Sequence, residues 1–227
     1  MKAATKPVQR PPDARLLIVA ADGRLRHAAR DRLPEVLEPG DLLVANDAAT
    51  IPASLHGVHL PSGASIEVRL AGVRSLAGQD VRHFTAVVFG AGDHRTRTEE
   101  RPLPPRLRRG DRLQLGPLTA RIVRTLGHPR LVCLRFDASP DEVWEGLAGH
   151  GKPVQYAHLP EPLALWDVWT AVAARPVAFE PPSAGFLLDW SMIHRLRARG
   201  VGFATLTLAA GISSTGDPAL DARLPLE

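Results

Sequence analysis

Residues 37–47 indicate the fold of this chain and read Leu37-Glu38-Pro39-Gly40-Asp41-Leu42-Leu43-Val44-Ala45-Asn46-Asp47. The Pro39-Gly40-Asp41 segment has the composition of a turn, because proline presets one backbone angle and glycine tolerates unusual ones. The four apolar residues from Leu42 to Ala45 predict a short buried strand. We expect this strand to end at Asn46-Asp47, where polar side chains replace the apolar run.

A helix, a glycine and a strand follow one another near the other end of the chain. Residues 189–199 have helical periodicity with Ile193 and Leu196 on the inner side, and Gly200 is placed to end the helix. Residues 201–208 then predict a second buried strand. This order is typical of an α/β layer.

Other segments extend the same interpretation. Residues up to Asp13 are rich in prolines and charges and are expected to form an arm, and residues 15–20 predict a buried strand. A helix is expected to begin at Ser139-Pro140-Asp141-Glu142, because serine caps a helix, proline suits its first turn and glutamate completes a capping box. Residues 163–174 predict a further helix.

The middle of the chain has a different pattern. Residues 65–70 and 84–89 alternate between apolar and polar side chains, and glycine turns separate them from further short candidates. Several short strands at this spacing predict a small barrel or sandwich. We therefore expect an α/β plus β fold, in which an α/β layered domain of residues 1–52 and 137–227 is interrupted by a small β-barrel domain of residues 53–136.

Composition limits the class of protein. The 227 residues are 44% hydrophobic and 23% charged, as in a globular chain, and 28 basic residues against 24 acidic ones are compatible with a polyanionic partner. The single Cys133 excludes a disulfide framework, and its apolar neighbours predict a buried position. No apolar run approaches the roughly 20 residues that span a bilayer, and no apolar signal core begins the chain. We expect a cytoplasmic location.

Four stretches form a set of motifs. The most specific is residues 37–47 followed by Ile51-Pro52-Ala53, and the others are residues 10–17, Ile66-Glu67-Val68, and a last group of Pro182-Ser183-Ala184-Gly185, Leu196, Gly200-Val201, Thr207-Leu208 and Gly211. In this order they resemble the S-adenosylmethionine:tRNA ribosyltransferase-isomerase family of queuosine biosynthesis. The resemblance implies an α/β domain interrupted by a β-barrel, which agrees with the patterns above.

The resemblance also implies a reaction. The ribosyl part of S-adenosylmethionine would move to the aminomethyl group of a 7-deazaguanine base in tRNA and be isomerised, with loss of adenine and methionine. S-adenosylmethionine is then the co-substrate and tRNA the partner, and no metal is expected, because none of the nine histidines has ligand spacing. A sulfonium makes the adjacent carbon acidic, so a general base is useful.

Matching motif positions supply the candidate site residues. Asp47 and Glu67 are the catalytic candidates, and the substrate-binding candidates are Asn46, Thr170, Pro182, Ser183, Ala184, Gly185, Thr207 and Gly211. Simpler roles stay open: Asn46-Asp47 as a strand-end turn, Glu67 as a solvent-facing residue of an alternating strand, and Ser183 as a cap. Thr170 and Thr207 could likewise be ordinary core or helix-face residues.

An arginine-rich segment lies in the predicted β domain. Residues 95–112 contain seven arginines, of which Arg106, Arg108 and Arg109 are candidates to contact tRNA phosphates. A solvated basic loop is an equal alternative.

The chain departs from the family at several motif positions. Ala48 and Ala49 stand where the family has Thr-Arg, Ser54 where it has a later Arg, and Leu187 and Ala209 where it has His. Family members also continue beyond the position of Glu227, so we expect a C-terminally short member with an incomplete α/β domain. Two alternatives to a full enzyme follow: a non-catalytic RNA-binding paralogue, and an inactive fragment of the longer enzyme. The oligomeric state stays open.

Overall fold

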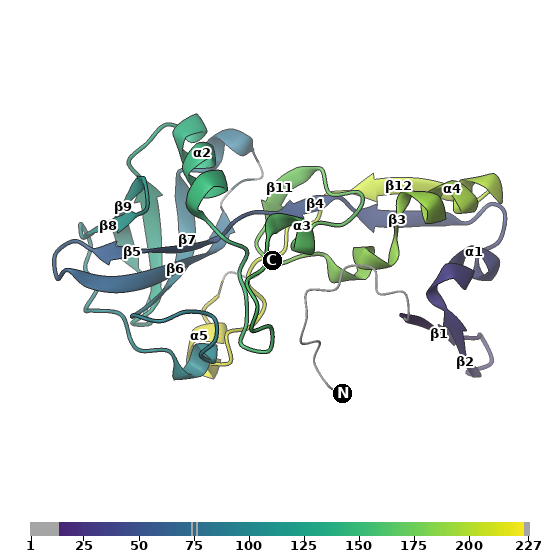
Figure 1. The fold of residues 1–227 in the computed structure, drawn as a ribbon, viewed down its shortest axis with the longest axis horizontal. Coiled ribbons are helices and arrows are strands. Elements are labelled where there is room, and N and C mark those ends of the chain that lie inside the picture. Colours follow the sequence, from purple (N-terminus) through teal and green to yellow (C-terminus); the bar gives the residue numbers. More distant parts are fainter. Residues whose placement is uncertain (1–13, 74, 76, 225–227) are drawn as a thin grey trace.

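A computed structural model of the chain describes residues 14–73, 75 and 77–224. The predicted arm, including residues 10–13 of one resembling stretch, lies outside them. The molecule is elongated, with a β-barrel at one end and smaller strand layers with short helices at the other (Figure 1). No helix in the described part of the chain has the length and apolar character needed to cross a membrane.

The barrel is closed by six antiparallel strands in the order β10-β7-β6-β5-β8-β9. Alternation fills its interior: on β8, Leu113 and Leu115 are fully buried whereas Arg112 is exposed. Phe84 and Phe136 pack edge to face inside, with ring centroids 5.8 Å apart. The predicted barrel is confirmed, and its strands are β5 (Ser54–His59), β6 (Ala64–Val73), β7 (His83–Phe89), β8 (Arg112–Leu115), β9 (Leu118–Thr125) and β10 (Leu131–Phe136).

Helix α2 (Pro140–His150) packs on the barrel. Its expected start is confirmed, because Ser139 and Glu142 form a capping box. Val143 and Leu147 are fully buried and belong to the same apolar cluster as the barrel interior. The domain boundary at residue 137 stays a prediction, but this packing joins α2 to the barrel core.

The other end of the molecule consists of paired short strands. β3 (Leu42–Asn46) runs parallel to β12 (Gly202–Leu206), and β4 (Ala48–Thr50) runs parallel to β11 (Arg175–Ala178). The 3₁₀ helix η1 (Arg30–Arg32) and the short helix α1 (Leu33–Val36) precede β3, α3 (Leu165–Val168) precedes β11, and the 3₁₀ helix η4 (Ser183–Leu187) follows β11. The 3₁₀ helices η2 (Gly78–Asp80) and η3 (Thr98–Glu100) lie in loops between barrel strands, and α5 (Pro218–Asp221) lies beside the barrel (Figure 1).

Helix α4 (Trp190–Ala198) packs beside β12. Ile193 and Leu196 are buried as expected, in a small cluster with Met192. Gly200 follows the helix with φ of 82°, a left-handed angle that glycine adopts without steric cost. The predicted helix–glycine–strand order is confirmed.

Three expectations for this end of the molecule are wrong in detail. The strand at residues 15–20 is not buried: β1 (Arg15–Val19) forms an isolated hairpin with β2 (Leu25–Ala29). The strands β3 and β12 are only partly buried, and Leu42 keeps 62% of its surface exposed. The helix expected at residues 163–174 is a single turn, α3 (Leu165–Val168), because tertiary contacts override helix propensity there. Thr50 on β4 donates to the Val168 carbonyl and accepts from the Trp169 indole.

Gly57 on β5 shows where barrel closure requires a glycine. A Cβ at Gly57 would lie 1.9 Å from the carbonyl oxygen of Gln114 on β8. We expect Gly57→Ala to reduce the free energy of unfolding by about 1–3 kcal/mol, since the strands must separate. Urea denaturation measures the change, and Gly78→Ala is the control because a Cβ there meets nothing within 4 Å. An equally small effect of both variants would contradict the close approach.

Candidate active site

Asp47 lies where β3 passes into β4 and the pairing strand changes from β12 to β11. Its backbone N–H donates to the Leu206 carbonyl, and its carbonyl accepts from the backbone N–H groups of Ala174 and Arg175 at 2.8 and 3.1 Å. Its carboxylate oxygen Oδ1 accepts a 2.6 Å hydrogen bond from the Thr207 hydroxyl. Ligands of α/β layers commonly bind beyond the carboxyl ends of parallel strands, where strand order switches.

Asn46 fixes the neighbouring strand end. Its side-chain amide donates to the Leu208 carbonyl at 2.8 Å, and its Oδ1 accepts from the backbone N–H groups of Leu208 and Ala48, each at 3.0 Å. The amide therefore continues the β3–β12 ladder by one residue and holds Thr207 against Asp47. The structure brings three of the predicted site residues together, and Asn46-Asp47 is more than a local turn.

Thr170 and Gly185 meet in a second contact. A Cβ at Gly185 would lie 2.8 Å from Cγ2 of Thr170, so the close approach depends on glycine. The Thr170 hydroxyl is buried and has no hydrogen-bond partner among the described residues. Ser183 and Ala184 are exposed in the 3₁₀ helix η4, for which Pro182 is the N-cap. Thr170 shortly precedes Ala174 and Arg175, whose backbone N–H groups donate to the Asp47 carbonyl.

Ser183 opens into a cavity of about 520 Å³. Tyr156 and Phe186 supply aromatic walls, and Glu180 and Asp167 supply carboxylates. Glu180 accepts from the Tyr156 hydroxyl and from the Ser213 hydroxyl, the latter at 2.7 Å. Burial, followed by the Glu180 charge, raises the pKa of Tyr156, so the hydroxyl stays protonated. The cavity size suits a small-molecule ligand, and its carboxylates suit a cation.

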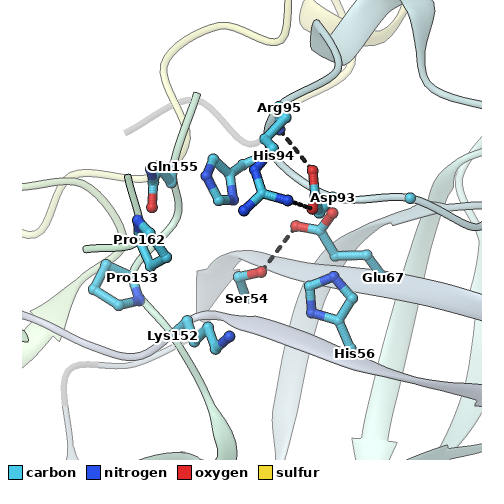
Figure 2. A pocket seen from close by; sticks show the side chains of 11 residues that line it. Ser54, His56, Glu67, Asp93, His94, Arg95, Lys152, Pro153, Gln155 and Pro162 are labelled. Atoms are coloured by element: carbon cyan, nitrogen blue, oxygen red, sulfur yellow. Dashed lines mark hydrogen bonds and ion pairs between the residues drawn. The ribbon is translucent and has the colours of Figure 1, made fainter. Parts of the chain in front are cut away.

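Glu67 borders a different cavity, of about 390 Å³, on the barrel. Figure 2 shows Glu67, Ser54, His56 and Lys152 along one side of this space, and His94 and Arg95 across from them. Lys152 follows α2 and pairs its backbone with Ser54 on β5. The structure therefore places Glu67 in a cavity other than the one that Ser183 lines.

The Glu67 carboxylate is fully engaged by buried cations. Oε1 accepts from the Ser54 hydroxyl at 2.8 Å and from Nε of Arg69 at 2.7 Å, and Oε2 accepts from Arg101. Burial opposes the ionised form, but Arg69 and Arg101 outweigh it and lower the pKa of Glu67 to about 2. The solvent-facing alternative is wrong, because Glu67 is 2% exposed. Its catalytic role stays a prediction, and the ion pairs favour a structural one.

The remaining candidates are more peripheral. Gly211 follows Ala210, whose carbonyl accepts from the Phe179 backbone N–H at the end of β11. Arg106, Arg108 and Arg109 are exposed in the loop before β8. Their side chains form no salt bridge within the part of the chain that the structure describes, so they are free to meet an anion.

Sequence patterns missed Tyr156 and Glu180. Both lie in irregular segments, where no periodicity marks inward-facing positions. Tyr156 is the only tyrosine of the chain and sits in the proline-rich stretch after α2. The sequence did contain one indication of a site there, because a lone tyrosine in an irregular stretch combines an aromatic face with a hydrogen-bonding hydroxyl.

The departures from the family motifs have structural counterparts. Ala48 and Ala49 are buried in β4, which leaves no room for the longer side chains that the resemblance expects there. Ser54 is buried and donates to Glu67. Leu187 and Ala209 are both partly buried and supply no titratable group.

The chain belongs to the queuosine biosynthesis protein family, whose model matches residues 1–221. It is similar to the S-adenosylmethionine:tRNA ribosyltransferase-isomerases of Thermosynechococcus vestitus (32% identity over 214 residues) and Methylobacterium sp. (33% over 224 residues). The matches cover 93% and 92% of this chain but 55% and 58% of those proteins. The chain thus spans about half the length of the curated relatives it matches, and the resemblance in its motifs is confirmed.

A solved structure also matches, that of the S-adenosylmethionine tRNA ribosyltransferase from Thermotoga maritima. It is 22% identical, the match covers 93% of this chain and 56% of that one, and the TM-score is 0.31.

Proposed function

We propose that this chain acts in S-adenosylmethionine-dependent ribosyl transfer to tRNA. The ribosyl moiety would be transferred to a 7-aminomethyl-7-deazaguanine base and isomerised, in the cytoplasm, where tRNA is modified. Membership of the family supports the reaction class. The observation that carries the assignment is the Asp47 carboxylate, held by Thr207 at the strand switch between β3 and β4.

Asp47 is the proposed general base. A carbon bonded to a sulfonium releases a proton to a well-placed carboxylate, because the positive sulfur stabilises the carbanion that remains. Thr207 orients Oδ1, and Asn46 fixes the backbone of the Thr207 segment. A positioned base of this kind lowers the barrier without moving during the reaction.

The donor is proposed to bind in the 520 Å³ cavity beside Ser183. Asp47 does not line this cavity, so the donor would have to extend from it toward the strand switch to meet the proposed base. The positive charge of the donor would be attracted by the carboxylates of Glu180 and Asp167, and its rings and sulfonium would meet the faces of Tyr156 and Phe186. The turn of Pro182, Ser183, Ala184 and Gly185 would form one wall, which Thr170 supports from behind.

Calorimetric titration with S-adenosylmethionine tests the proposal. Saturable binding by the chain is expected, and Glu180→Gln should weaken it at least tenfold, since Glu180 supplies a carboxylate to the wall of the proposed donor cavity. The control is Asp22→Ala, which removes an exposed carboxylate paired with Arg24. A folded chain that binds no S-adenosylmethionine would contradict a donor site in these residues.

A second candidate is a non-catalytic RNA-binding paralogue. The buried Ala48 and Ala49 favour it, because they replace polar residues that the family motif carries beside Asp47. The exposed Arg106, Arg108 and Arg109 would then bind tRNA without turnover. Binding of tRNA without binding of S-adenosylmethionine would identify this case.

A further inference from the structure

Four basic residues line up across neighbouring strands of the barrel. Arg112 on β8 lies opposite Arg121 on β9, Arg121 lies opposite Arg135 on β10, and Arg135 lies opposite His83 on β7. All four side chains are exposed, whereas the residues beside them in each strand point into the barrel core. We call Arg112, Arg121 and Arg135, with His83 at the end, the basic row.

The basic row works against the stability of the barrel. Adjacent strands lie about 4.8 Å apart, so side chains directly opposite are close neighbours, and like charges there repel. One carboxylate offsets the row: Asp137 is 3.6 Å from Arg121. Among the described residues, neither Arg112 nor Arg135 forms an ion pair. Residues that repel one another and lower stability are typical of functional sites, where binding a ligand matters more than local stability.

More cations adjoin the same face. The backbone N–H of Gly110 donates to the Ile122 carbonyl, so the loop before β8 continues the ladder beside β9. This loop carries the exposed Arg106, Arg108 and Arg109. On β9, Arg124 is exposed and lies opposite Cys133 of β10. The basic row therefore belongs to a larger positive surface on strands β8, β9 and β10.

We propose that the basic row binds the phosphodiester backbone of RNA. Guanidinium groups donate paired hydrogen bonds to phosphate oxygens, and a rigid sheet holds them at fixed intervals, which suits a chain of regularly spaced anions. Contacts to phosphates position a nucleic acid without reading its sequence. The inference rests on the proposed function in naming tRNA as the RNA, and it adds residues outside the arginine-rich loop.

Salt-dependent binding of fluorescently labelled tRNA tests the basic row. The triple variant R112Q/R121Q/R135Q is expected to bind at least tenfold more weakly near 0.1 M salt. The slope of log affinity against log salt should fall by about 2–3, because each lost phosphate contact removes about 0.7–0.9. The matched control R24Q/R26Q/R199Q removes the same charge from exposed residues at the far end of the molecule and should keep the slope.

Thermal unfolding and donor titration separate the outcomes. The row variant should melt no lower than the wild type, because repulsion is relieved; a lower melting temperature would make the row structural and overturn the proposal. Equal slopes for row and control variants, or displacement of tRNA by polyglutamate at equal charge, would overturn it too. The wild-type chain could fail to bind S-adenosylmethionine while the row variant still shows a smaller salt slope of tRNA binding. That result would support the RNA-binding surface and contradict the proposed transferase function.

Discussion

Glu67→Gln is expected to lower the free energy of unfolding by about 3–5 kcal/mol, because it leaves a buried ion pair without its anion. Glu67, Arg69 and Arg101 are each 2% exposed, so water cannot solvate the charges that remain. Both guanidinium groups also lie over the ring of Phe89, at 4.9 and 5.2 Å from the ring centroid. Glutamine keeps the shape but supplies no charge. Urea denaturation measures the loss.

The exposed pair of Arg32 and Glu35 supplies the control. Its atoms are 2.7 Å apart, but both side chains are more than half exposed, so Glu35→Gln should change stability little. Similar losses in the two variants would show that burial of Glu67 contributes nothing, and would contradict the ion-pair account.

The pH dependence of the free energy of unfolding tests the same Glu67 ion pairs in a second way. The pKa of Glu67 is lowered in the folded chain from 4.5 to about 2, so its contribution is fully present above pH about 4.5. The contribution is lost as pH falls through the folded pKa near 2. Wild type should therefore lose roughly 3 kcal/mol of stability between these pH values through Glu67 alone, and Glu67→Gln should lack that loss.

Under the proposed function, Asp47→Asn is expected to lower the rate of ribosyl transfer to tRNA by about 10²–10⁴, the usual contribution of a general base. The amide keeps the size of the side chain and can still meet Thr207, so the folded structure and tRNA affinity should persist. Single-turnover transfer from labelled S-adenosylmethionine measures the effect. A rate within a factor of two of wild type would remove Asp47 from the mechanism.

Thr207→Val refines the assignment of Asp47. The variant removes the hydroxyl that donates to Oδ1 at 2.6 Å and leaves the carboxylate in place. A hydrogen bond to a charged group is worth about 1.5–3 kcal/mol, so the rate should fall roughly 10–100-fold. A loss as large as that of Asp47→Asn would mean that Thr207 itself contacts the reacting groups.

Asn46, Asp47 and Thr207 could be predicted as candidates one by one because each belongs to a sequence motif, whereas their contacts appear only in the structure. Asn46 and Asp47 end an apolar run after a turn, and Thr207 directly follows β12, the strand that pairs with β3. The surroundings of Glu67 could not be predicted in this way. Its partner Arg101 is 34 residues away in the loop between β7 and β8, and only the folding of that loop against β6 brings the two side chains together.

How far the strands of the α/β end are buried could not be predicted from the sequence either. An apolar run such as Leu42 to Ala45 indicates a strand, but burial depends on how many layers cover it. Here β3 has one strand partner, and of its residues Ala45 alone is buried. The barrel expectations succeeded because alternation within each strand fixes which side chains meet inside.

Cys133 gives this chain a ready-made probe. It is the only thiol, and it is half-buried rather than enclosed in the core, on the outward-facing side of β10 opposite Arg124. A maleimide dye or a spin label would therefore attach at a single position, two residues from Arg135, without any engineered cysteine. Changes in its emission or mobility would follow molecules that arrive on that side of the barrel.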